Sequence, residues 1–254
     1  DGTGTGNTEA RFSANVVLNS QRAAYDTINN LAAVMRAMPF YSAGAVNISC
    51  DKPTDASYIY NLSNVSEAGF SYSSASKDTK FTVVNVSYFD METAEIDYET
   101  VEDTGRWFLY TQNNEAETVT FTASLESGTI VRVGTVINIA DPMRAGVRRG
   151  GRIKTGVSTT QIIVDDQNNT DLATSGSATL SVILSDGTLE TKTISSVSGA
   201  TITVDSAFSS VPQTNSVWVI ENTSVELQTF RVVSVTEQEL LNYQIVAVVH
   251  DPNK

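Results

Sequence analysis

The sequence has few of the residues that build active sites and covalent cross-links. Its 254 residues include one cysteine, Cys50, and one histidine, His250. A single cysteine excludes an internal disulfide, and a zinc site at His250 would lack its usual Cys or second His partners, so we expect this histidine to be structural or exposed. There is also no GxSxG, P-loop or GxGxxG motif. The sequence therefore offers no catalytic residue, cofactor site or metal site, and it favours a scaffold over an enzyme.

Positive charge and long apolar runs are also scarce. Sixteen Lys and Arg against 29 Asp and Glu give a formal charge of −13, which repels phosphate backbones and argues against nucleic-acid binding as the main activity. No segment approaches the ~20 apolar residues of a membrane span. The opening DGTGTG is neither an initiator methionine nor a signal peptide, so we expect a fragment of something longer with a flexible Gly/Thr leader.

The first 68 residues predict an α+β unit. Residues 11–18 alternate apolar and polar side chains, as a strand does. Apolar residues then recur at helical spacing up to Pro39, which is expected to end the helix because the residue before a proline is pushed out of the α region. Residues 40–50 predict a hairpin that turns near Ala43 and Gly44. We interpret the apolar helix stripe as core packed on a small sheet, with a partner-binding face as the alternative. The stripe comprises Ala24, Ile28, Leu31, Met35 and Met38.

Beyond residue 68 the helical period disappears and strand patterns dominate. Runs at 81–89, 95–101, 119–125, 160–165, 178–184, 188–197, 201–205, 216–220, 227–235 and 243–250 alternate apolar with polar residues. Asp186-Gly187 predicts a hairpin with a type I′ turn. The predicted fold class is mainly β (α+β): a strand–helix–hairpin unit at 1–68, then a β-barrel region at 69–254 with a small inserted β-domain at about 165–222. Trp107 and Trp218 lie inside apolar runs and are interpreted as core.

Residues 127–153 combine strand patterns with an unusual loop. Segments 130–133 and 135–140 are predicted strands, Asp141-Pro142 ends the second, and Ile153 begins the next. The loop and its flanks carry five of the sixteen basic residues, namely Arg144, Arg148, Arg149, Arg152 and Lys154. These five form a possible partner-contact loop facing an acidic subunit, and ordinary solubilising charge explains them equally well.

Two groups of oxygen-bearing side chains have the composition of a functional site. Asp165, Gln167, Asn169 and Asp171 alternate as in a calcium loop, but threonine stands where that loop needs glycine, and a surface turn explains the same letters. The pair Asp97 and Glu99 has the composition of a glycosidase acid pair. Acidic residues at turns are expected in so acidic a chain, so no metal, cofactor or catalytic role follows.

Short motifs spread along the chain carry a family resemblance through their shared order. They are FSANVVLNS (12–20), GFSYS (69–73), VNVSYFD (84–90), VEDT (101–104), ETVTF (117–121), GTVINI (134–139), GGRI (150–153), SVW (216–218) and FRV (230–232). Together they resemble the tail-tip attachment, or host-specificity, protein J of lambda-like phages. Two departures stand out. Val133 replaces a family proline, and a few dozen family residues are missing between Thr104 and Gly105, where we expect a chain gap or an engineered junction.

The resemblance implies a structural protein of a phage or prophage virion, made in the host cytoplasm and placed at the tail tip. It implies a central hub, a homotrimer that closes the tail tube, contacts the distal tail ring and the tape measure, and lets DNA pass without specific binding. An acidic channel lining is expected, because a basic one would hold the duplex. The alternative is an adhesin-like or carbohydrate-binding β-module, which needs exposed aromatic side chains on one flat face. A glycosidase is the third hypothesis.

Overall fold

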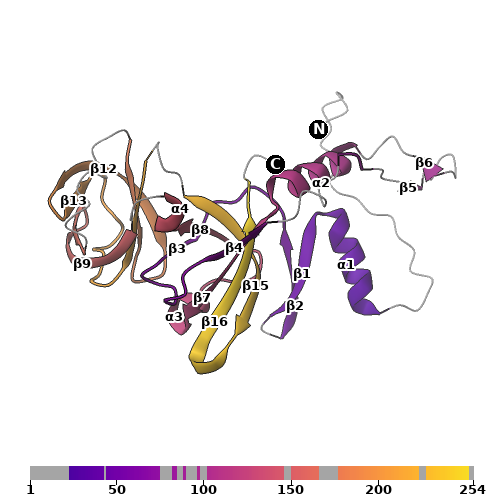
Figure 1. The fold of residues 1–254 in the computed structure, drawn as a ribbon, viewed down its shortest axis with the longest axis horizontal. Coiled ribbons are helices and arrows are strands. Elements are labelled where there is room, and N and C mark those ends of the chain that lie inside the picture. Colours follow the sequence, from indigo (N-terminus) through magenta and orange to yellow (C-terminus); the bar gives the residue numbers. More distant parts are fainter. Residues whose placement is uncertain are drawn as a thin grey trace. The chain divides into compact units, whose positions relative to one another are not determined.

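The computed structural model describes residues 23–42, 44–74, 82–84, 88–89, 96–97, 102–145, 150–165, 177–222 and 227–251. The chain divides into two compact units, Asp1–Pro53 and Thr54–Lys254. Strands dominate, as Figure 1 shows, and the predicted mainly β class with an N-terminal helix and hairpin is confirmed. Across the described residues no helix is long and apolar enough to cross a membrane.

The first unit is a helix followed by a two-stranded hairpin. Helix α1 spans Ala24–Val34, and β1 (Ala37–Ser42) pairs antiparallel with β2 (Ala45–Cys50) through a turn where Gly44 has φ +79°. The predicted hairpin is confirmed. The prediction that Pro39 ends the helix is wrong. The helix ends at Val34, Arg36 takes a left-handed φ of 53°, and Pro39 lies within β1, where a strand of a two-stranded sheet tolerates its missing N–H.

The apolar stripe of α1 is mostly exposed. Ala32 is the buried residue of this helix, whereas Leu31 and Met35 are each 37% exposed. The interpretation of the stripe as packed core is therefore wrong for these two side chains. Only part of a short helix can be covered by a hairpin of two strands, so the remaining apolar surface is open within the described part of this unit.

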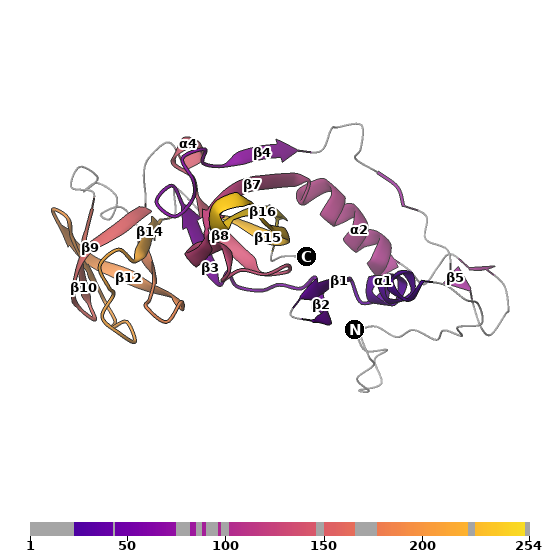
Figure 2. The same cartoon turned by 90° about the horizontal axis from the view of Figure 1, so that it is seen from below.

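The second unit contains a six-stranded sheet and a closed six-stranded barrel (Figures 1 and 2). The sheet order is β3-β8-β15-β16-β7-β4, with β3 at Tyr58–Asn61, β4 at Ser71–Ser74, β7 at Glu117–Ser124, β8 at Val136–Ala140, β15 at Gln228–Glu237 and β16 at Asn242–Val249. The barrel order is β10-β13-β12-β11-β14-β9, with β9 at Gly150–Ser158, β10 at Gln161–Val164, β11 at Thr179–Ile183, β12 at Leu189–Ser198, β13 at Thr201–Val204 and β14 at Val217–Glu221. The remaining elements are β5 (Tyr88–Phe89), β6 (Ile96–Asp97), α2 (Glu102–Asn114), α3 (Leu125–Gly128), α4 (Pro142–Ala145) and the 3₁₀ turn η3 (Glu239–Leu241).

The barrel is inserted between two neighbouring strands of the sheet. Strands β8 and β15 pair directly, with Ile139 opposite Gln228, although all six barrel strands lie between them in sequence. The barrel begins at Gly150, earlier than the expected insertion at about 165. The first predicted unit extended to residue 68, but the chain divides after Pro53. Residues 54–61 belong to the second unit, where strand β3 pairs with β8.

Each of the two β structures has its own core. The sheet packs around Tyr60, Phe121 and Phe230, and the barrel packs around Leu180 and Trp218. Burial raises the pKa of Tyr60, whose hydroxyl donates to the carbonyl oxygen of Ser127 at 2.6 Å. Two barrel residues, Ile183 and Val217, belong to the core of the sheet. Apolar packing therefore continues from the sheet into the outer surface of the barrel.

Several local predictions need correction. Helix α2 was missed, and it includes Thr104 and Gly105, the two residues between which family residues are missing. Segment 130–133 is not a strand but a turn and coil that follow α3. The hairpin at Asp186-Gly187 is confirmed, but Gly187 alone of the pair has positive φ, +84°, and its N–H donates to the Leu184 oxygen at 3.0 Å. The turn is thus a three-residue loop with a glycine bulge, and not the expected type I′ turn.

Candidate functional site

The basic loop lies where the chain passes from the sheet into the barrel. Arg144 lies on α4 after β8, and Arg152 and Lys154 lie on β9. Arg148 and Arg149 fall outside the described residues. The loop was predicted as a partner contact, and its described cations can serve that role only where they are not already bound within the chain.

Arg144 is held by three strands of the sheet. Its guanidinium makes a fork-like ion pair with Glu117 on β7, in which Nη1 lies 2.8 Å from Oε2 and Nη2 contacts Oε1. Nη1 also donates to Gln228 Oε1 on β15 at 3.0 Å, and the guanidinium carbon lies 3.6 Å from the ring centroid of Tyr72 on β4. Burial, with the nearby carboxylate of Asp141, raises the pKa of Tyr72. Arg144 therefore links strands β4, β7 and β15 of the sheet through contacts within the chain.

The Arg144 pair predicts a pH-dependent contribution to stability. Its hydrogen bond holds the pKa of Glu117 below the ordinary value. A carboxylate of lowered pKa adds stability above its ordinary pKa and loses it as the pH falls through the lowered value. We expect Glu117→Gln to cost about 1 kcal/mol at pH 7, because the pair is partly exposed, and progressively less below pH 4. Urea unfolding at each pH measures this cost. Arg144→Lys should also lower the free energy of unfolding at pH 7, since lysine keeps the charge but lacks the fork. An equal cost at pH 7 and pH 2.5 would contradict the assignment.

Arg152 joins the barrel to the loop after β3. Its Nε and Nη2 donate to the Ser63 carbonyl oxygen at 3.3 and 2.9 Å, and Nη1 donates to the Asn215 oxygen at 2.8 Å. Lys154 has an exposed side chain, and its backbone oxygen accepts from Thr214 Oγ1 at 3.4 Å. Of the three described cations of the basic loop, Arg144 and Arg152 thus have structural roles within the chain, and Lys154 has its side chain exposed.

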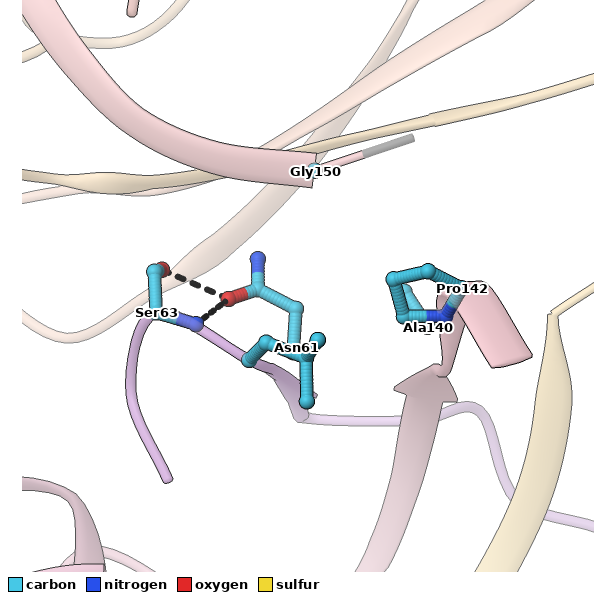
Figure 3. Close-up of a pocket in the computed structure, with 6 residues that line it drawn as sticks. Asn61, Ser63, Ala140, Pro142 and Gly150 are labelled. Atoms are coloured by element: carbon cyan, nitrogen blue, oxygen red, sulfur yellow. Dashed lines mark hydrogen bonds between the residues drawn. The ribbon is translucent and has the colours of Figure 1, made fainter. Parts of the chain in front are cut away.

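A small pocket lies where the loop after β3 meets the barrel, a contact that we call the joint (Figure 3). It has a volume of about 150 Å³ and is lined by Asn61, Leu62, Ser63, Ala140, Pro142 and Gly150. Asn61 is buried; its Oδ1 accepts from the backbone N–H and hydroxyl of Ser63 at 2.8 and 2.6 Å, and its Nδ2 donates to the Trp218 oxygen at 3.3 Å. None of the six lining residues has a titratable side chain. The pocket has room for a few water molecules, and it offers neither an acid nor a base for catalysis.

Gly150 lets the two β structures approach each other at this point. A Cβ at this position would lie 2.8 Å from both Asn61 Nδ2 and the Trp218 oxygen. Asn64 supports the same turn by accepting the Asn61 N–H at 2.8 Å and donating to the Ile59 oxygen at 2.9 Å. The hydrogen-bonded joint and the apolar contact through Ile183 and Val217 together hold the barrel against the sheet.

A second polar cluster surrounds the histidine. His250 is 3% exposed, so the exposed interpretation is wrong, and its Nδ1 lies 3.8 Å from Glu115 Oε1 and 3.2 Å from Arg231 Nη2. Glu115 accepts the backbone N–H of Asp251 at 2.8 Å, and Tyr110 donates its hydroxyl to the Asp251 carboxylate. The cluster ties the end of α2 to the end of β16. In the described parts of the chain, no group of three His, Cys, Asp or Glu is placed to hold a metal.

The other residues considered from sequence have ordinary surroundings or fall outside the description. Asp165 accepts the Trp218 indole N–H at 3.0 Å, while residues 167, 169 and 171 of the calcium hypothesis lie outside the described residues, as does Glu99. Trp218 is 1% exposed, which confirms it as core. Trp107 lies on α2 and is only half-buried, so its assignment to the core is wrong.

The sequence analysis did not identify Asn61 and Asn64, the two asparagines at the joint. Both are buried polar residues, and their position directly after the run Tyr58 to Tyr60 is the feature of the sequence that could have indicated them. A buried amide needs hydrogen-bond partners, which predicts a fixed turn but not the strand that it contacts.

The fold and the site define a β-rich module in which a barrel is inserted into a sheet and packs against it. No model of a known protein family matches the chain. The chain is 31% identical over 287 residues to the Tip attachment protein J of Escherichia phage SECphi27, which covers 99% of this chain and 24% of that protein. It is 26% identical over 260 residues to the Tip attachment protein J of Escherichia phage SECphi4, covering 90% of this chain and 22% of that protein.

The resemblance to tip attachment protein J is therefore confirmed over almost the whole chain. The chain spans about a quarter of the length of these curated relatives. The first alignment covers 287 residues and this chain has 254, so the SECphi27 protein carries additional residues within the matched stretch. Additional family residues were expected from the motifs.

Proposed function

We propose that this chain is a segment of the tail-tip attachment protein of a phage or prophage, located at the virion tail tip, where it acts as a structural part of the central hub and not as an enzyme. The observation that carries the proposal is the similarity along 99% of the chain to a protein named Tip attachment protein J. The hub closes the tail tube, organises assembly of the tail tip and lets DNA pass.

The joint between sheet and barrel supports a scaffold role. Gly150, Asn61 and Arg152 hold the two β structures in one arrangement through direct contacts and hydrogen bonds. A hub must keep the spacing of its neighbours constant, and buried hydrogen bonds with close backbone contacts favour a single arrangement over many. The pocket at the joint has a lining of small and uncharged residues, which suits packing rather than turnover.

Assembly supplies the test of the hub proposal. Closed oligomers cover the edge strands of neighbouring subunits, so three copies around a channel would protect edge strands such as β4. We expect the whole protein to have the mass of a trimer by light scattering and to co-purify with the distal tail ring and the tape measure. A whole protein that stays monomeric at high concentration, with no tail protein bound, would contradict the hub.

The basic loop is proposed as a contact to an acidic partner subunit. Arg144 and Arg152 bind within the chain, whereas the side chain of Lys154 is exposed, so Lys154 is the described cation that we assign to the partner. Arg148 and Arg149 remain assigned to the partner from the sequence alone. We expect Arg148→Ser/Arg149→Ser to weaken the contact and to leave the unfolding midpoint of the chain unchanged. Arg152→Ser should lower that midpoint, because it removes the bonds to Ser63 and Asn215.

The charge of the chain predicts how it treats DNA. With a formal −13, the chain is expected to bind duplex DNA no more tightly than millimolar at low salt, because phosphate repulsion outweighs one basic loop. Titration with a short duplex, followed by fluorescence anisotropy, measures this. Micromolar binding that weakens steeply with salt, and disappears when Arg148, Arg149 and Arg152 become serine, would show that the loop holds DNA and would end the proposal of free passage.

A further inference from the structure

The turn of the β15–β16 hairpin has an unusual backbone for its residues. Leu240 and Leu241 both have φ of 60°, and Leu240 has ψ of 38°. The Gln238 N–H donates to the Asn242 oxygen at 2.7 Å and closes the turn. The hairpin is the long yellow ribbon of Figure 1, and this turn forms its lower end.

Two leucines are poor residues for this conformation. In the left-handed region Cβ crowds the neighbouring carbonyl, and hairpin turns that need two consecutive positive φ values favour Asn-Gly. Three other hairpin turns among the described residues have a positive φ, and glycine occupies that position in each, namely Gly44, Gly187 and Gly199. Leucine at 240 and 241 therefore works against the local preference of the turn. Strain of this kind is maintained where the side chains serve another purpose.

Most of the surface of both leucines is open to solvent within the described structure. Leu240 is 91% exposed and Leu241 is 56% exposed. Ser124 at the end of β7 pairs with Asn242 at the start of β16, so Leu125 and Leu241, the next residues outward along each chain segment, lie at the same end of the sheet. Leu125 is 43% exposed. We call Leu125, Leu240 and Leu241 the leucine tip.

Acidic side chains flank the leucine tip. Glu126, Glu237 and Glu239 are all exposed, and residues 232–250 contain no lysine or arginine. Anionic lipid headgroups repel such a surface, and membrane-inserting segments carry cations and aromatic side chains instead. A protein surface that pairs an apolar pocket with lysine or arginine around it complements the tip in both shape and charge.

We infer that the leucine tip inserts into an apolar pocket, edged by basic side chains, on a different protein of the tail. The inference rests on the proposed tail function and adds a contact surface to it. Leu240 and Leu241 fill the pocket, and the three glutamates pair with its cations. The turn closes the β15–β16 hairpin, and β16 is also paired with β7 as far as Asn242, so the position of the tip is set before binding, which lowers the entropy lost on association.

One variant with two substitutions separates the role of the leucines in binding from their role in folding. Leu240→Asn/Leu241→Gly supplies the residues that the turn prefers and removes both apolar side chains. We expect its Tm to rise by about 2–4 °C, since relief of the turn stabilises the hairpin. The yield of infectious particles from cells that express the whole protein with this change should fall at least tenfold. A structural role for the leucines predicts the opposite, a lower Tm. Val157→Ser, which also removes an exposed apolar side chain, is the control and should leave the yield unchanged.

Photo-crosslinking identifies what occupies the tip. The whole protein carrying p-benzoylphenylalanine at position 240 is assembled into tails and irradiated, and the product is mapped by mass spectrometry beside a position-157 control. The expected result is one site on a different tail protein, where apolar residues lie next to lysine or arginine, and loss of that product when Leu241 is also replaced by Gly. A link to a second copy, a link to lipid, no link at 240, or binding of the chain to phosphatidylcholine/phosphatidylglycerol vesicles would each overturn the inference. A whole protein absent from tails altogether would instead overturn the proposed function, and the inference with it.

Discussion

Gly156→Ala is expected to unfold the barrel under conditions in which the unaltered chain is folded. A Cβ at residue 156 would lie 1.8 Å from the carbonyl oxygen of Pro212 and 2.9 Å from its carbonyl carbon. Both atoms are backbone, so no side chain can rotate away, and Pro212 is itself buried. We expect a loss of about 3 kcal/mol, the upper part of the range for an overpacked interior.

Urea unfolding followed by circular dichroism measures the loss at Gly156. The matched control is Gly187→Ala, because no atom lies within 4 Å of a Cβ at residue 187 and its cost comes from φ +84° alone. That control should lose about 1 kcal/mol, the cost of placing a side chain in the left-handed region. Equal losses for the two variants would show that the close approach of β9 to Pro212 does not limit the barrel.

Trp218→Ala is expected to destabilise the chain nearly as much, by a different route. Trp218 is 1% exposed and is the largest fully buried side chain among the described residues, so its removal leaves a cavity in the barrel core. Loss of a buried aromatic side chain costs about 3–5 kcal/mol. The change also removes the indole donor to Asp165, and Trp218→Phe should recover most of the volume while still lacking that donor.

Trp107 is the natural comparison for Trp218. It lies on α2 and is half-buried, so Trp107→Ala should cost clearly less than Trp218→Ala in the same chemical unfolding experiment. Circular dichroism is the suitable readout, because both variants lose a fluorophore. A larger loss at Trp107 than at Trp218 would mean that α2, and not the barrel core, limits stability.

Much of the strand content followed from local patterns in the sequence. In β7, the alternate residues Val119, Phe121 and Ala123 are buried, which is the period-two pattern seen in the letters. The turns at Gly44 and Gly187 were marked by residues that adopt positive φ. Alternation and turn chemistry act over fewer than ten residues, so they can be read without knowing the fold, and the mainly β class was confirmed for this reason.

Helix α2 shows where local patterns fail. Its residues Trp107, Phe108, Leu109 and Tyr110 are consecutive and apolar, and Gly105 lies inside the helix. A helix is recognised from apolar residues three or four apart, so a continuous apolar run resembles a buried strand equally well. Contacts such as that of Tyr110 with Asp251, across 141 residues, stabilise this segment and are invisible in its letters.

Composition and motif order by themselves determined the β class, the hairpins and the resemblance to tip attachment protein J. Only the tertiary structure decided that β8 and β15 pair around an inserted barrel, and that Arg144 binds Glu117 and Gln228, which are 27 and 84 residues away. The physical reason is that strand pairing and ion pairs depend on distance in space, whereas alternation, turn residues and charge are properties of neighbours along the chain.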